Sequence, residues 1–354
     1  MAKTENKACS CSGSQSRPTV EEPWMVESLA TPAGEIPAAG TKLTWADRFG
    51  GWKARWGHRS NFRIPPGLYA VGKPAAADVI LVTANYKLTF DKLRQELSGL
   101  NAWLLVLDTR GINVWCAAGK GTFSTQEVIR QLRSTPIQAV STNKTLVLPQ
   151  LAAPGVAAHQ VKQETGYTVV YGPVHAIDIP LFLKKGLKAT SKMRTLPFSL
   201  WDRLVLIPVE LVSVMKYFFI YFMVAGILSF ALGKGTASNL ALLGLPVLGA
   251  LLVGTVMVPA LLPCLPFRSF ALKGWSAGIL WAATASIWAG AGKLQFLGNL
   301  FLLPILSAGF ALAFTGSTTF TSQTGVNKEI RLFARPMALL GVLGASLMAA
   351  NWWF

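Results

Sequence analysis

The sequence predicts an α/β Rossmann-like domain followed by an all-α membrane domain of about five transmembrane helices. In the first half, short apolar runs alternate with segments that carry helix-capping residues, a pattern typical of a parallel sheet. The second half is almost uniformly apolar. Across 354 residues, 52% are hydrophobic and 14% are charged, and the mean hydropathy is +0.42. This composition excludes an ordinary soluble protein and indicates membrane spans.

Composition divides the chain into four parts. Residues 1–40 are polar and rich in Ser, Thr, Pro and Ala, which predicts a disordered tail. The tail has no apolar segment of the kind that a signal peptide needs, so we expect it to stay in the cytosol. Residues 41–186 hold the α/β domain, 187–206 form a basic juxtamembrane linker, and 207–354 hold the transmembrane helices.

Strand-like runs define the α/β domain, at 78–83, 102–107, 145–148 and 167–171. Thr89 is the predicted N-cap of a helix over 89–97, and a capping box that begins at Ser124 opens a later helix. Because the carboxyl ends of parallel strands meet at one edge of a sheet, the loops that follow them should converge there: 83–89, 108–120, 150–155 and 171–174.

The segment from Asn113 to Lys120 follows the second strand at this edge. With Asn113 as N-cap, Cys116 falls in the first helical turn, where backbone N–H groups and the helix dipole favour its thiolate. A thiolate is the form of cysteine that ligates metals or attacks electrophiles. The next residues are small and leave a shallow surface that suits a large flat ligand: Ala117, Ala118 and Gly119.

These residues resemble a known family, the HgcA corrinoid proteins of bacterial and archaeal mercury methylation. The family signature is Asn-(Val/Ile)-Trp-Cys-Ala-(Ala/Gly)-Gly-Lys, and Asn113 to Lys120 match it at every position. The resemblance implies a corrinoid-binding domain related to the corrinoid iron–sulfur protein of acetyl-CoA metabolism, followed by a membrane domain. It implies that Cys116 is the catalytic residue and the lower axial ligand of cobalt in a cobalamin-type corrinoid.

The resemblance and the predicted convergence of loops together name the residues expected to contact the corrinoid: Thr83, Thr89, Asn113, Val114, Trp115, Cys116, Ala117, Ala118, Gly119, Lys120, Gly155 and Gly172. Two of these have a structural alternative. Thr89 is equally explained as a helix cap, and Trp115 as a core residue.

The function implied by the resemblance is transfer of a methyl group from methyl-cobalt to Hg(II), forming methylmercury. A folate-linked donor would supply the methyl group. The chain has four cysteines and no CxxC pair, so a ferredoxin-like [4Fe–4S] partner, HgcB in this family, would supply electrons. The remaining partners are Hg(II) and the lipid bilayer, with no nucleic acid.

Alternatives remain open. The corrinoid could carry methyl groups to another acceptor, or the chain could be a transporter with a cytosolic regulatory domain. A nucleophilic cysteine would need a histidine base, and none of the three histidines lies in a protease-like signature: His58, His159 and His175. Cys9 and Cys11 form a CxC pair that could bind a soft metal or simply be free, and Cys264 could relay mercury or be inert.

Apolar segments predict spans at 207–232, 238–262, 274–292, 294–316 and 333–353. The net charge is +17, and the linker and alternate loops of the apolar half carry Lys and Arg residues, which fits the positive-inside rule better than nucleic-acid binding. We therefore expect a multi-pass protein of the cytoplasmic (inner) membrane, with the α/β domain in the cytosol and the C-terminus outside.

Overall fold

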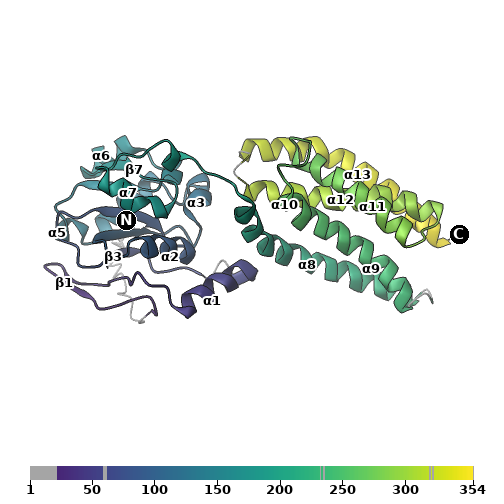
Figure 1. The fold of residues 1–354 in the computed structure, drawn as a ribbon, viewed down its shortest axis with the longest axis horizontal. Coiled ribbons are helices and arrows are strands. Elements are labelled where there is room, and N and C mark those ends of the chain that lie inside the picture. Colours follow the sequence, from purple (N-terminus) through teal and green to yellow (C-terminus); the bar gives the residue numbers. More distant parts are fainter. Residues whose placement is uncertain are drawn as a thin grey trace, which may run out of the picture. The chain divides into compact units, whose positions relative to one another are not determined.

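The computed structural model describes residues 22–58, 62–231, 233, 236–318, 320 and 323–353. The chain separates into two units (Figure 1). Unit 1 comprises Met1–Trp52 and Ser60–Thr195, and unit 2 comprises Lys53–Arg59 and Leu196–Phe354. Cys9 and Cys11 lie outside the described residues, so their roles stay predictions.

A five-stranded sheet forms the centre of unit 1, in the order β3-β5-β4-β6-β7. Its strands are β3 (Gly67–Val71), β4 (Ile80–Ala84), β5 (Ala102–Leu107), β6 (Thr145–Leu148) and β7 (Thr168–Tyr171). Four strands run parallel, as predicted, but β3 pairs antiparallel with β5 at the edge. The sequence offers little warning of β3, because its short apolar run follows directly on two prolines and a glycine.

The prediction of a disordered tail over 1–40 is wrong for residues 22–40. This segment forms a hairpin of β1 (Leu29–Thr31) and β2 (Gly34–Ile36). Before it, Trp24 is 1% exposed, and its ring packs edge-on against Tyr69 and Phe90 with centroids 5.4 and 4.9 Å away. Burial of this large side chain stabilises the segment on the domain.

Helices cover both faces of the sheet, because alternate residues of each strand point to opposite sides. The helices of unit 1 are α1 (Trp45–Lys53), α2 (Lys87–Glu96), α3 (Val114–Lys120), α4 (Thr125–Ser134), α5 (Ile137–Val140), α6 (Ala158–Thr165) and α7 (Ile179–Lys184), with short turns η3 (Gln150–Ala152), η4 (Ala176–Asp178) and η5 (Lys192–Arg194). The turn that follows α1, η1 (Ala54–His58), belongs to unit 2. Residues of α2 and α7 pack with Leu81 of β4 in one core cluster, whereas residues of α3 to α6 pack with Ile80 and Val82 in the other.

The predicted helix starts are right at two of three positions. Asn113 and Ser124 are N-caps, as expected. Thr89 is not a cap, because α2 begins at Lys87 with Tyr86 as its N-cap. Thr89 lies inside the first turn, and its N–H donates to the Tyr86 carbonyl at 2.9 Å.

Unit 2 is helical, with long helices that run alongside one another (Figure 1). Its elements are α8 (Leu200–Ala231), α9 (Ala237–Leu252), η6 (Val253–Met257), α10 (Val258–Ala260), α11 (Phe270–Trp288), α12 (Lys293–Phe314), η7 (Thr315–Ser317) and α13 (Gln323–Trp353). Four helical stretches of the described residues are long and apolar enough to cross a membrane: Leu200–Ala231, Asn239–Ala260, Lys293–Phe314 and Thr324–Asn351. These helices suggest a membrane protein.

The fifth predicted span, 274–292, corresponds to α11, which is not among those four. Small residues on α11 lie against α12: a Cβ added at Gly274 would be 2.6 Å from the Ser307 carbonyl oxygen, and one at Gly278 would be 2.6 Å from Pro304 Cα. The same small residues, together with Lys273, dilute the apolar character of α11. Within the described residues, four helices rather than five are therefore long and apolar enough to cross a membrane.

Candidate functional site

The sheet of unit 1 has a topological switch point at β4. The chain passes from β4 to β5 on one side and then crosses back to β6 on the other. The helix that follows β4 covers one face, while those that follow β5 and β6 cover the opposite face. Parallel sheets of this kind bind ligands beyond the carboxyl ends of the strands that flank this point. The loops after β4, β5 and β6 are therefore the natural place to search for a site.

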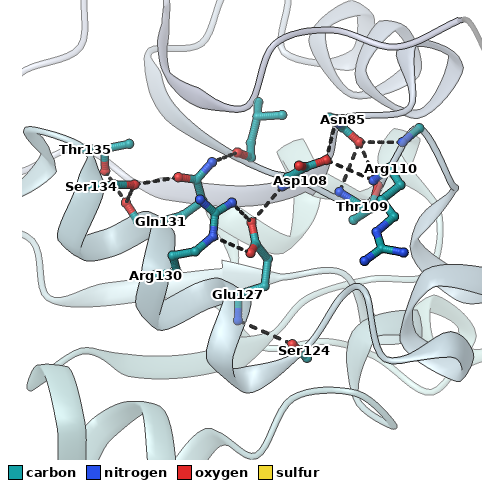
Figure 2. A network of polar contacts seen from close by, with 12 residues as sticks. Asn85, Asp108, Thr109, Arg110, Ser124, Glu127, Arg130, Gln131, Ser134 and Thr135 are labelled. Atoms are coloured by element: carbon teal, nitrogen blue, oxygen red, sulfur yellow. Dashed lines mark hydrogen bonds and ion pairs between the residues drawn. The ribbon is translucent and has the colours of Figure 1, made fainter. Parts of the chain in front are cut away.

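Asn85 joins two of these loops. It follows β4 directly and is 2% exposed. Its Oδ1 accepts hydrogen bonds from the backbone N–H groups of Thr109 at 3.1 Å and Gly111 at 2.9 Å. Its Nδ2 donates to Asp108 Oδ1 at 3.1 Å (Figure 2). One buried side chain thus fixes the loop after β5 against the end of β4.

The loop after β5 contains a left-handed turn, with φ of 58° at Arg110 and 71° at Gly111. For arginine this conformation costs about 1 kcal/mol. Asp108 supports it, because its Oδ1 accepts from the Arg110 N–H at 3.0 Å and its own N–H donates to Glu127 Oε1 at 2.9 Å. Arg130 binds the Glu127 carboxylate at 2.7 Å, and this hydrogen bond raises the pKa of Arg130 (Figure 2).

This polar network was not among the predicted site residues. The signal available in the sequence was the run Asp108-Thr109-Arg110-Gly111, which is typical of a turn. The partner that organises the turn, Asn85, comes from another loop and carries no local signal. The network matters because it sets the position at which α3 begins.

The first turn of α3 has the predicted geometry. Asn113 has extended φ and ψ of −64° and 160°, and its Oδ1 accepts a hydrogen bond from the Cys116 N–H at 2.9 Å. At the other end, Gly121 adopts a left-handed φ of 76° and closes the helix onto the carbonyls of Ala117 and Ala118. A helix of seven residues is thus capped at both ends.

Burial divides α3 into two sides. Its inner side contributes three residues to the core: Val114, Ala117 and Ala118. Cys116 is a free cysteine of intermediate burial, and Trp115 is likewise partly buried and lies outside that core cluster. Gly119 and Lys120 are exposed. Cys116 is therefore held on a helix capped at both ends and is only partly buried.

Gly155 brings the loop after β6 against α3, as predicted for the converging loops. A Cβ at this position would be 2.2 Å from the Phe123 carbonyl oxygen and 3.1 Å from Ala118 Cα. Gly172 packs against the core instead, because a Cβ added at this position would be 3.1 Å from Val147 Cγ1. Both glycines thus have a packing role, and their contact with a ligand stays a prediction.

The two predicted threonines do not lie beside Cys116 on α3. Thr83 is 1% exposed and, by strand alternation, points toward the α2 side of the sheet, opposite to the side on which α3 packs. Thr89 lies in the first turn of α2. Burial of Thr83 does not favour direct contact with a ligand, so these two assignments rest on the sequence alone.

Among the described residues, no group of three or more His, Cys, Asp or Glu side chains is arranged to hold a metal ion. Cys116 is accordingly a candidate to donate one thiol ligand to a metal whose other ligands come from elsewhere. Cys264, between α10 and α11, is exposed.

Comparison with known proteins finds similarity in the α/β domain. The family model for the CO dehydrogenase/acetyl-CoA synthase delta subunit matches residues 58–183. The gamma subunit of the acetyl-CoA decarbonylase/synthase complex of Archaeoglobus fulgidus is 33% identical over 129 residues, which are 36% of this chain and 27% of that protein. The α/β domain is related to these subunits.

The gamma subunit of Methanopyrus kandleri is 32% identical over 124 residues, covering 34% of this chain and 26% of its own length. The gamma subunit of Methanothermobacter thermautotrophicus is 31% identical over 124 residues, covering 34% of this chain and 27% of its own length. The chain thus spans about a quarter of the length of the curated relatives that it matches. The family model ends before the apolar helices of unit 2 begin.

Proposed function

We propose that this chain is a membrane-anchored corrinoid protein that transfers a methyl group to Hg(II), forming methylmercury. The observation that carries the proposal is the partly buried Cys116 on a short, doubly capped helix that follows the carboxyl end of β5. Similarity to the gamma subunits supports corrinoid methyl transfer. The choice of mercury rests on the match of Asn113 to Lys120 with the mercury-methylation signature.

The residues of α3 fit a corrinoid. A single thiolate is a suitable axial ligand for a metal whose other ligands belong to a macrocycle. Gly119 has no side chain, and a Cβ added there would point into open space, with no atom of the described chain within 4 Å. The outer surface of the helix is therefore flat at this position. A bound corrinoid supplies a cobalt centre that takes up and gives up a methyl group.

Each protein group has a definite task in this proposal. Asn113 holds the backbone of Cys116 in place, because its Oδ1 accepts the hydrogen bond from the Cys116 N–H. Cys116 would hold the cobalt of a corrinoid through Sγ, and a sulfur ligand donates more electron density to a metal than an imidazole does. This donation would favour delivery of the methyl group to an electrophile such as Hg(II). Asn85 and Asp108 keep α3 in position.

The partners in this proposal are a folate-linked methyl donor and a ferredoxin-like [4Fe–4S] protein that supplies electrons. The sequence contains no CxxC pair of its own, which supports an external reductant. We further propose that the α/β domain lies in the cytosol, that α11 crosses the membrane together with the four long apolar helices, and that the C-terminus lies outside.

Similarity to subunits of an acetyl-CoA complex favours a second candidate, in which the corrinoid carries a methyl group to an acceptor other than mercury. The transporter interpretation gains no support from these relatives.

An anaerobic experiment on the full-length chain tests the proposal. The protein and its Cys116→Ala variant are reconstituted with cobalamin, and their visible spectra are compared. A bound-corrinoid spectrum that differs between the two is expected, together with loss of methylmercury formation in the variant. Identical spectra would overturn the ligand assignment. Methyl transfer to a thiol acceptor, with none to Hg(II), would establish the second candidate.

A further inference from the structure

Helix α1 presents three large aromatic side chains to solvent. Trp45, Phe49 and Trp52 are 84%, 62% and 54% exposed. Their spacing of four and three residues places them on one face of the helix. The Phe49 and Trp52 rings stack, with centroids 5.8 Å apart at 30°. Exposed aromatics that gather in this way mark an interaction surface more often than single exposed residues do.

The opposite face of α1 is fixed to the domain. Asp47 lies roughly 180° around the helix from the aromatic face. It is 6% exposed and forms ion pairs with Lys87 at 2.6 Å and Arg94 at 2.7 Å. Gly51 is also buried, and a Cβ there would be 2.9 Å from Leu88 Cδ2. The aromatic face is therefore held outward by contacts on the inner face.

The exposed charges on α1 are positive. Arg48 and Lys53 lie on either side of the aromatic face, and the Arg48 guanidinium sits 5.6 Å from the centroid of the Trp45 ring. The acidic residue of this helix, Asp47, is neutralised in the buried ion pairs. An aromatic face bordered by cations is the composition of helices that lie in the interface of an anionic bilayer.

We propose that α1 is an in-plane membrane helix, with Trp45, Phe49 and Trp52 inserted among the lipid headgroups. The same chain has four helices long and apolar enough to cross a bilayer, and their insertion would keep α1 at a high local concentration near the membrane surface. Tryptophan favours this zone because its ring is apolar and its N–H is polar. The flanking cations select a lipid surface, with its anionic headgroups, over a neutral apolar protein partner.

The test uses the full-length chain in vesicles of three parts phosphatidylcholine to one part phosphatidylglycerol, doped with a lipid that carries a nitroxide near its headgroup. The four native cysteines are replaced by serine, and Phe49→Cys is labelled with an environment-sensitive fluorophore. The matched control is Gln163→Cys, an exposed position on α6, which covers the other side of the sheet. Quenching at position 49 should exceed that at position 163 by at least about twofold.

Equal quenching at positions 49 and 163 would overturn the proposal. A blue-shifted but unquenched label at 49 would overturn it as well, because it would indicate a protein contact such as a second copy of the chain. A third variant adds Trp45→Gln and Trp52→Gln to the labelled Phe49→Cys protein. It should retain its midpoint of thermal unfolding, because both tryptophans are exposed, and should lose most of the quenching. Unchanged quenching in this variant would contradict the assignment.

Discussion

The side chain of Asn113 helps to position Cys116, the candidate cobalt ligand. Its Oδ1 accepts a hydrogen bond from the Cys116 backbone N–H. Behind it, Asn85 positions the whole loop that leads into α3. The role of Asn113 can be predicted from the sequence more readily than the role of Asn85. A cap precedes its own helix and can be predicted from local pattern, whereas the partners of Asn85 lie more than twenty residues away.

Replacing Asn113 with alanine should lower the free energy of unfolding by about 1 kcal/mol, because the Cys116 N–H loses its partner. It should also weaken binding of cobalamin, since the helix that carries the thiol would fray. Asn113→Ser restores a capping oxygen and should retain most of both properties. Chemical denaturation and an anaerobic cobalamin titration measure the two effects. Equal cobalamin affinity in Asn113→Ala and the native protein would show that the cap has no role in the site.

At the scale of elements, the ion cluster beneath α1 explains where α2 begins, which the sequence did not reveal. Lys87 binds both Asp47 and Asp91 in a buried setting, at 2.6 and 2.8 Å. This contact draws α2 to begin at Lys87, two residues before the predicted cap at Thr89. Tertiary contacts of this kind override local capping preference.

The cluster also predicts acid sensitivity. Burial alone would raise the pKa of Asp47, but hydrogen bonds from Lys87, the Thr44 N–H and Arg94 outweigh it and hold that pKa well below its usual range. The unfolded chain has the ordinary aspartate pKa of about 3.9. Because the folded state binds this proton less readily, the stabilisation is complete above about pH 4 and is lost as the pH falls further.

Asp47→Asn should therefore lower stability at pH 7 by about 3 kcal/mol, because it leaves the buried Lys87 and Arg94 with one carboxylate, Asp91, in place of two. The difference from the native protein should shrink as the pH falls below about 4. Thermal unfolding across this range measures both. Glu164→Gln is the control, since its ion pair with Arg133 is exposed and should contribute little. A difference that stays constant with pH would contradict this account.

Most of the α/β architecture could be predicted from the sequence, because buried parallel strands carry continuous apolar runs such as Ala102–Leu107. The edge strand β3 and the ordered segment around Trp24 could not, since each depends on partners distant in sequence. In the site, the capped Cys116 helix was predictable from Asn113 and the small residues after Cys116. The burial of Thr83 was not, because only the packing of α2 and its neighbours reveals it.

At the scale of the whole molecule, α11 decides the topology of the membrane part. Nineteen helical residues span about 28 Å, close to the ~30 Å of a hydrocarbon core. A loop of four residues, 289–292, joins α11 to α12, and the two helices pack along one another through Gly274 and Gly278. If α12 crosses the bilayer, the short connection leaves α11 beside it, and α11 crosses the bilayer in the opposite direction.

We therefore expect a C-terminal alkaline phosphatase fusion to be active and a C-terminal fluorescent protein fusion to be dark, because the C-terminus would lie outside. Fusions after residue 190 report on the α/β domain and should give the opposite pattern. If only the four long apolar helices cross, the C-terminus would share the side of the α/β domain, and both fusion sites would behave alike. The positive charges at Lys328, Arg331 and Arg335 favour the first outcome.

The burial of Trp24 has a practical consequence for anyone who expresses the α/β domain by itself. A fragment that begins at residue 41 would omit Trp24, whose ring packs edge-on against both Tyr69 and Phe90. It would also lose the hydrogen bond from the Ala39 N–H to the Ala70 carbonyl at the edge of the sheet. Emptying a site of this size costs about 3–5 kcal/mol, a large share of the stability of a small domain. A soluble fragment should therefore begin upstream of Trp24.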